Sequence, residues 1–280
     1  MKSSYSLLDS GDLEKLELLG GYRIIRPSLN SFYKKSDPKL WSGVDAHYIK
    51  NDRGSGEWKF FSKIPEIIKI SLNKKIQIQC KLTPFGHIGF FPEQQENWDL
   101  LSGISRGKRP LEVLNLFAYS GVSTLYSAMN GMNVCHVDAS KGMVDWAREN
   151  SRLSNLENSN IRWIVDDVQK FVMRETRRGR KYDGFILDPP SFGRGAKGEI
   201  WKIEKDLIPL LDSLMELRSE EFRFVFLSCH TSGFSPLTLD RLLKSYISDS
   251  KENFTELELY VRDSLGNKLP GGFCARYIAD

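Results

Sequence analysis

From Leu111 onward, short apolar segments alternate with amphipathic ones, and this alternation limits the possible folds more than any other feature of the chain. The apolar runs have strand length, and the segments between them carry apolar residues at helical spacing. Strands are predicted at 112–116, 133–138, 161–165, 184–188, 222–227, 254–261 and 273–278. Helices are predicted at 122–129, 141–153, 168–177, 204–217 and 237–246. Such an alternation predicts a mostly parallel sheet with helices on both faces.

The last two predicted strands are joined by D-S-L-G-N-K-L-P-G-G, which is too short to hold a crossover helix. They must therefore pair as an antiparallel hairpin. The prediction is an α/β, Rossmann-like sheet of seven strands that ends in this hairpin. Residues 1–84 instead show short apolar bursts broken by turn residues, which predicts a small β-rich N-terminal domain. We expect two domains, residues 1–84 and 85–280.

The first strand of the sheet runs into the turn F-A-Y-S-G at 117–121, and the second ends in the acid Asp138. A strand–turn–helix–strand–acid unit binds a cofactor that carries a nucleoside, with the acid on the ribose hydroxyls. A dinucleotide site would need G-x-G-x-x-G to hold a pyrophosphate. Here only Gly121 is present, and Phe117 and Tyr119 fill the turn. The turn therefore suits a cofactor without phosphates, S-adenosylmethionine rather than NAD.

Within residues 85–230, four segments together are similar to a known family. They are G-F-F-P-E-Q-Q-E-N-W at 89–98, L-N-L-F-A-Y-S-G at 114–121, V-D-A-S at 137–140 followed by W-A-R-E-N at 146–150, and D-P-P-S-F at 188–192. This part of the chain resembles the class I methyltransferases that act on bacterial large-subunit (23S) ribosomal RNA, in particular the cytosine-C5 enzymes. Each segment alone would be a weak signal.

The resemblance implies transfer of a methyl group from S-adenosylmethionine to a base of ribosomal RNA, with C5 of cytosine favoured. Three alternatives stay open: a small molecule or protein side chain as substrate, N-methylation of a base, and an RNA-binding module without turnover. The net charge of +4 lies mostly in the first hundred residues. The N-terminal domain is therefore a candidate for contact with the RNA substrate.

The predicted cofactor site draws on the strand ends and on the segment before the first strand. Asp138 would hold the ribose, while Phe90, Phe91 and Gln94 would cover the methionine side of the cofactor. For the adenine, the residues alone leave Asp166 and Asp167 nearly even, and the resemblance favours Asp167. The full prediction is Phe90, Phe91, Gln94, Asn115, Phe117, Ala118, Tyr119, Ser120, Gly121, Asp138, Ala139, Ser140, Asp167, Val168 and Asp188.

Four residues are predicted to act on the substrate base. Asp188 and Pro189 would orient it through oxygen acceptors, and Phe192 would stack on it. Prolines also simply terminate strands, so the motif has a structural interpretation too. Cys229 follows the fifth strand, where its thiolate could add to C6 of cytosine. A buried, packed cysteine is the alternative.

The cysteines Cys80, Cys135, Cys229 and Cys274 form no C-x-x-C pair, which argues against a structural metal site. Scattered free thiols fit the reducing cytoplasm. No apolar run approaches the length that spans a membrane. We therefore expect a cytoplasmic enzyme with no metal and no membrane association. The sequence leaves the oligomeric state open.

Overall fold

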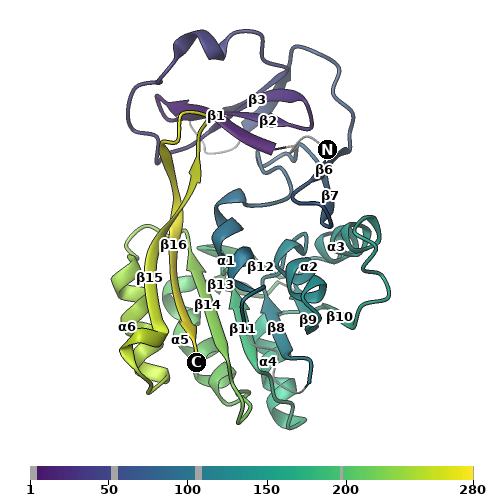
Figure 1. The fold of residues 1–280 in the computed structure, drawn as a ribbon, viewed down its shortest axis with the longest axis vertical. Coiled ribbons are helices and arrows are strands. Elements are labelled where there is room, and N and C mark those ends of the chain that lie inside the picture. Colours follow the sequence, from purple (N-terminus) through teal and green to yellow (C-terminus); the bar gives the residue numbers. More distant parts are fainter. Residues whose placement is uncertain (1–4, 52–55, 105–108, 196–197, 280) are drawn as a thin grey trace. The chain divides into compact units, whose positions relative to one another are not determined.

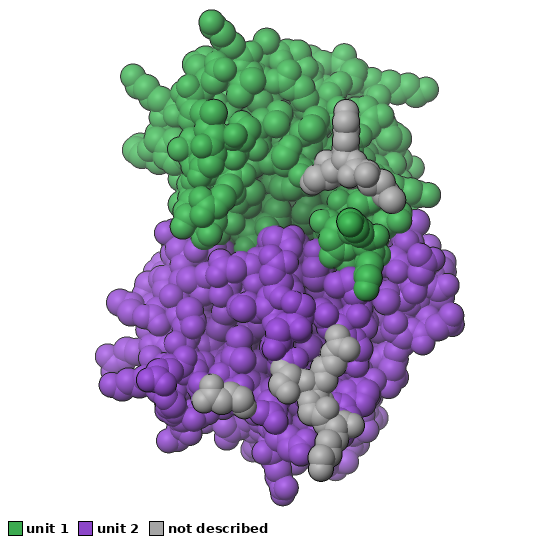
Figure 2. Space-filling model, in the orientation of Figure 1, with its two compact units in different colours: residues 1–93, 260–271 green, residues 94–259, 272–280 purple. Residues whose placement is uncertain are grey.

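A computed structural model of the protein describes residues 5–51, 56–104, 109–195 and 198–279. The chain forms two compact units, shown in different colours in Figure 2. The first contains residues 1–93 and 260–271, and the second contains residues 94–259 and 272–280. The sequence places the domain boundary after residue 84, whereas the compact units divide after residue 93.

The first unit is built on a five-stranded sheet in the order β1-β2-β3-β4-β5. All neighbours pair antiparallel except β3 and β4, which are parallel. The strands are β1 (Tyr5–Gly11), β2 (Glu14–Leu19), β3 (Tyr22–Pro27), β4 (Ala46–Lys50) and β5 (Gly56–Phe60), with η1 (Pro38–Trp41) before β4 and the hairpin β6 (Ile68–Ser71)–β7 (Gln77–Cys80) after β5. This confirms the predicted β-rich N-terminal region.

A buried ion pair stabilises the centre of this sheet. Arg26 on β3 donates from Nε and Nη2 to the two carboxylate oxygens of Glu17 on β2, at 2.6 and 2.7 Å. The Tyr5 hydroxyl donates to the same carboxylate at 2.8 Å. Because a buried charge is costly without partners, this geometry is what allows Glu17 to sit at 0% exposure.

The predicted seven-stranded sheet has the order β10-β9-β8-β11-β14-β16-β15 (Figure 1) and belongs to the second unit, except for residues 260–262 of β15 and 268–271 of β16. Its strands are β8 (Glu112–Leu116), β9 (Asn133–Asp138), β10 (Ile161–Val165), β11 (Gly184–Leu187), β14 (Phe224–Cys229), β15 (Phe254–Arg262) and β16 (Lys268–Ile278). The first five are parallel, and β16 pairs antiparallel with β14. The predicted fold class and the terminal hairpin are therefore confirmed.

The helices follow the strands closely in sequence. They are α1 (Gln95–Leu100), α2 (Val122–Met129), α3 (Lys141–Leu153), α4 (Val168–Arg177), α5 (Ile203–Met215) and α6 (Pro236–Tyr246), with the short turns η2 (Pro92–Gln94) and η3 (Lys251–Asn253). The sequence did not predict α1 or the small hairpin β12 (Phe192–Arg194)–β13 (Ile200–Lys202). Both are too short to show a hydrophobic period.

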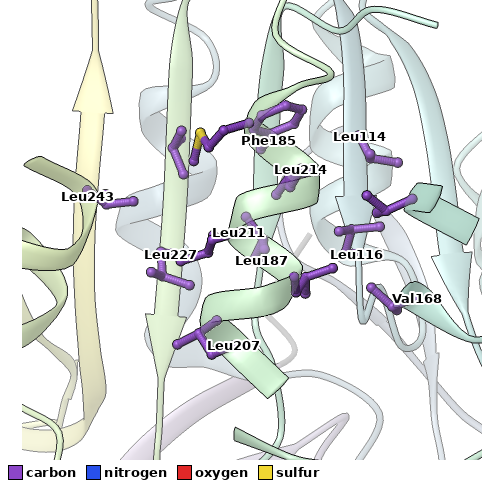
Figure 3. Close-up of a cluster of buried hydrophobic side chains, with 14 of the residues drawn as sticks. Leu114, Leu116, Val168, Phe185, Leu187, Leu207, Leu211, Leu214, Leu227 and Leu243 are labelled. Atoms are coloured by element: carbon purple, nitrogen blue, oxygen red, sulfur yellow. The ribbon is translucent and has the colours of Figure 1, made fainter. Parts of the chain in front are cut away.

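One face of the large sheet carries a continuous apolar core (Figure 3). Alternate residues of the central strands, such as Leu114 and Leu116 on β8, meet the apolar stripe of α5 at Leu207, Leu211 and Leu214. Helices α4 and α6 add to the same cluster. Because strand side chains alternate between faces, the intervening strand residues point to the opposite face, where α2 contacts both β8 and β9.

None of the helices in the described parts of the chain is long and apolar enough to cross a membrane.

Candidate functional site

The predicted site residues that follow β8, β9, β10, β11 and β14 share one edge of the sheet, because the carboxyl ends of parallel strands meet there. The chain order runs outward from β8 through β9 to β10, and then reverses to β11 and β14 on the other side. This reversal is the topological switch point at which open α/β sheets bind ligands. The topology thus places the strand-end residues around one ligand position.

The turn between β8 and α2 has an unusual backbone. Phe117 and Tyr119 adopt φ values of 55° and 49°, and Gly121 has 87°. Left-handed conformations are rare for aromatic residues and mark functional sites when the surroundings impose them. Here the amide of Ala118 donates to the Val137 carbonyl at 3.1 Å, which ties the turn to β9.

Asp138, at the end of β9, is held by two backbone amides. Its Oδ2 accepts from the N–H of Tyr119 at 2.9 Å, and its Oδ1 accepts from the N–H of Ser140 at 2.8 Å. Burial raises the pKa of Asp138, and these two hydrogen bonds oppose that shift. Each carboxylate oxygen can accept more than one hydrogen bond, so both can also meet a pair of vicinal hydroxyls. The neighbouring Ala139 leads into Ser140, the N-cap residue of α3.

Beneath the turn, a buried polar chain joins β8, α2 and β9. Asn115 donates to the Thr124 hydroxyl at 2.9 Å, and that hydroxyl lies 2.9 Å from Nδ1 of His136. Burial lowers the pKa of His136 to about 3, so the ring is neutral. Asn150 on α3 donates to the Ser120 carbonyl at 2.9 Å. Asn150 therefore holds the turn at Ser120, and Asn115 ties β8 to the helix that follows the turn. The contact of Asn115 and Ser120 with a cofactor stays a prediction.

The two acids after β10 have different roles in the protein. Asp166 forms an ion pair with Arg174. Asp167 is the N-cap of α4 and accepts from the Lys170 N–H at 2.9 Å, with Val168 as the first helical residue. The capping bond uses one oxygen of Asp167. The assignment of Asp167 to adenine remains a prediction.

Asp188, directly after β11, lies between two side chains. Gln94 Nε2 donates to its Oδ2 at 3.1 Å, and His230 Nε2 lies 3.3 Å from its Oδ1. Downstream of Pro189, the Pro190 carbonyl accepts from Trp201 Nε1 at 2.7 Å.

The Trp201 ring also packs against Phe117, with ring centroids 4.8 Å apart, so it links the two loops. Phe192 is half exposed. The sequence did not single out Trp201, because its contacts come from a hairpin that carries no local signal.

Cys229 is the last residue of β14 and is fully buried. Its sulfur accepts from the Thr231 N–H at 3.4 Å, and burial raises the pKa of the thiol. It belongs to the apolar cluster under α4, α5 and α6. Cys80, Cys135 and Cys274 are also buried, as expected of core residues.

Phe90 and Phe91 belong to the first unit. Phe90 is buried and packs edge-on against Tyr5, and Phe91 meets the ring of His87 in the same way. Their predicted contact with the cofactor stays a prediction.

Comparison with solved structures identifies the family. The chain superposes on a SAM-dependent methyltransferase from Agrobacterium tumefaciens with a TM-score of 0.91 and 35% sequence identity, and the match covers 99% of this chain and 91% of that one. The chain belongs to the S-adenosylmethionine-dependent methyltransferases. The cofactor is therefore S-adenosylmethionine, as the form of the turn predicts.

This methyltransferase also matches parts of longer curated proteins. Ribosomal RNA large subunit methyltransferase I of Aeromonas hydrophila is 33% identical over 128 residues, which are 45% of this chain and 32% of that protein. Ribosomal RNA large subunit methyltransferase K/L of a Shewanella species is 28% identical over 226 residues, 78% of this chain and 30% of that protein. The chain thus spans about a third of the length of these relatives. No family model matches the sequence.

The methyltransferase's own residues fit the cofactor. The fixed Asp138 carboxylate matches a ribose diol, and the bulky turn leaves out the glycines that a pyrophosphate would need. Among the described residues, no three His, Cys, Asp or Glu side chains gather in a way that could hold a metal ion.

Proposed function

We propose that this methyltransferase modifies a base of ribosomal RNA. Matches to two differently named large-subunit ribosomal RNA methyltransferases support an RNA substrate. The observation that carries the proposal is the set of groups around Asp188, which can grip a planar base. A carboxylate and a neighbouring carbonyl accept hydrogen bonds from an amino or ring N–H, and the exposed Phe192 offers a stacking surface.

For the atom that is methylated, the geometry supports nitrogen best. Bound S-adenosylmethionine supplies an electrophilic methyl group on sulfur. Asp188 and the Pro189 carbonyl would hold the N–H groups of the base so that the nitrogen lone pair faces that methyl carbon. The nitrogen would take the methyl group as S-adenosylhomocysteine leaves, and the Asp188 carboxylate would accept the proton that the nitrogen releases. The chain's contribution is orientation, which alone supplies a large share of such a rate enhancement.

Methylation at C5 of cytosine is the second candidate, and the position of Cys229 at the end of β14 favours it. That route needs an accessible thiolate, since C5 is a poor nucleophile without covalent activation. The Cys229 side chain is instead buried, with a raised pKa. The residue before Cys229 on β14 is Ser228, and its hydroxyl donates to Gln94, which in turn contacts Asp188. Because neighbouring strand residues point to opposite faces, Cys229 faces away from that group.

The deciding experiment measures transfer from labelled S-adenosylmethionine to deproteinised ribosomal RNA, followed by nucleoside analysis. We compare the wild type with Asp188→Asn and Cys229→Ala. The nitrogen route predicts an N-methylated nucleoside, a severe loss in Asp188→Asn and near-normal turnover in Cys229→Ala.

A 5-methylcytosine product that disappears in Cys229→Ala would instead establish the second candidate. If the wild-type protein binds S-adenosylmethionine but labels no ribosomal RNA, the RNA substrate itself is refuted. Binding of S-adenosylmethionine by each variant, measured by calorimetry, is the control for a correctly folded site.

A further inference from the structure

A chain of buried polar side chains leads from β16 to Asp188. Arg276 donates from Nε to Oδ1 of Asn97 at 2.6 Å. Asn97 donates from Nδ2 to Oε1 of Gln94 at 2.6 Å, and Gln94 donates from Nε2 to Oδ2 of Asp188 at 3.1 Å. Arg276, Asn97 and Gln94 are each at most 7% exposed. Arg276 lies 88 positions after Asp188 in the sequence (276 − 188), so only the fold brings the two ends of this hydrogen-bonded series together.

Arg276 fixes the donor-to-acceptor direction of all the hydrogen bonds in this series. A guanidinium only donates hydrogen bonds, so Asn97 must turn its oxygen toward Arg276 and its amide nitrogen toward Gln94. Gln94 must then present its oxygen to Asn97, and the Ser228 hydroxyl donates to that same oxygen at 3.3 Å. The amide nitrogen of Gln94 is left to face Asp188. Reversing either amide would set two donors or two acceptors against each other.

Arg276 is itself anchored. Its Nη1 donates to Glu96 at 3.0 Å, and the Glu96 side chain is 48% exposed. Within the described residues, Nη2 of Arg276 and Oδ1 of Asp188 have no hydrogen-bond partner. The links that are made still favour one arrangement, because reversing an amide would leave further buried polar groups unpaired, which is costly.

We propose that Arg276 is a positioning residue for methyl transfer, which acts through Asn97 to aim the Gln94 amide at Asp188. This inference rests on the proposed role of Asp188 in orienting the substrate base. The Gln94 amide donates to one oxygen of Asp188, so the direction of that amide helps to set the orientation of the carboxylate. A base held by Asp188 is therefore aligned by a residue that does not touch it.

The first test needs no substrate. In protein labelled with 15N-glutamine, the side-chain amide signals of Gln94 are assigned by their loss in Gln94→Met. We expect Asn97→Asp and Arg276→Met to shift these signals as Asp188→Asn does. Arg276→Lys, which still only donates, should leave them near their wild-type positions. Gln95 donates to Asp99, and neither residue takes part in the hydrogen bonds between Arg276 and Asp188. The side-chain amide signals of Gln95 are therefore the internal control.

Asn97→Asp separates positioning from packing. The new carboxylate still accepts from Arg276, so the melting temperature should not fall. A carboxylate at position 97 cannot donate to Gln94. We therefore expect the Gln94 amide group to rotate, so that its nitrogen donates to residue 97 and its oxygen faces Asp188. Turnover on ribosomal RNA should then fall about ten- to hundredfold, the cost of losing one hydrogen bond to a charged group.

Unchanged Gln94 signals in both Asn97→Asp and Arg276→Met would overturn the inference, as would wild-type turnover in Asn97→Asp. If the wild type labels no ribosomal RNA, the proposed function fails, but the amide signals still decide whether Arg276 aims Gln94.

Discussion

The substitution Gly121→Ala tests most directly how the turn at residues 117–121 is held against α3. The φ of Gly121, +87°, lies in the left-handed region, where an L-residue costs roughly 1–2 kcal/mol. A Cβ at this position would lie 2.7 Å from the Cβ of Ala147, which is fully buried on α3. Forcing a methyl group into a packed site adds about 1–3 kcal/mol. We therefore expect Gly121→Ala to lower the free energy of unfolding by roughly 2–5 kcal/mol.

Gly179 provides the matched control. It also has a left-handed φ, +64°, but no atom lies within 4 Å of the position its Cβ would take. Gly179→Ala should therefore cost only the backbone term, roughly 1–2 kcal/mol. The difference between the two variants isolates the contact with Ala147.

Urea titration of both variants at one temperature measures the two losses. Calorimetry should also show weaker binding of S-adenosylmethionine to Gly121→Ala only, because relief of the clash moves the amides of the turn. If Gly121→Ala is no less stable than Gly179→Ala, the close packing of the turn on α3 is refuted.

Three further outcomes follow from the structure. Asp138→Ala should weaken binding of S-adenosylmethionine by about 1.5–3 kcal/mol in calorimetry, and an unchanged affinity would remove the ribose assignment. Phe192→Ala should lower turnover on ribosomal RNA about tenfold without changing cofactor affinity, since stacking on a base is lost; equal turnover would exclude the stack. Burial alone would raise the pKa of Glu17, but the charges of Arg26 and Lys15 and the hydrogen bonds from Arg26 and Tyr5 together outweigh it and lower that pKa from 4.5 to about 2. A lowered pKa means that the pair stabilises the protein above pH 4.5 and that this stability is lost as the pH falls toward 2. The melting temperature of Glu17→Gln should therefore depend less on pH in this window than that of the wild type, and parallel curves would contradict the assignment.

The mostly parallel sheet and its terminal hairpin could be predicted because the strands and the longer helices each carry their own hydrophobic period. The start of α2 after Gly121 and the end of β9 at Asp138 are examples of boundaries set by local residues. The left-handed backbone at Phe117 and Tyr119 could not be predicted, since aromatic residues do not favour it and only the packing around the turn imposes it.

Contacts between residues far apart in the chain were equally invisible in the sequence. Arg276 and Gln94 lie 182 positions apart (276 − 94), and their connection through Asn97 appears only once β16 pairs with β14. The burial of Cys229 depends on three helices that cover its face of the sheet. A strand-end position is therefore visible in a sequence, while the direction of the side chain is set by tertiary packing.

The tip of the β15–β16 hairpin has a consequence for how the polypeptide is assembled during translation. Residues 260–271 belong to the first unit, where Ser264 donates to the Leu8 carbonyl and Asn30 donates to the Pro270 carbonyl. The first 93 residues therefore leave the ribosome long before the segment that completes their unit. Domains usually fold in the order in which they are synthesised. Here the first unit is complete only when a contact forms between residues some 250 positions apart, and closing so long a loop has an entropic cost. We expect nascent chains that stop before Tyr260 to leave the first unit incomplete, and therefore dependent on chaperones.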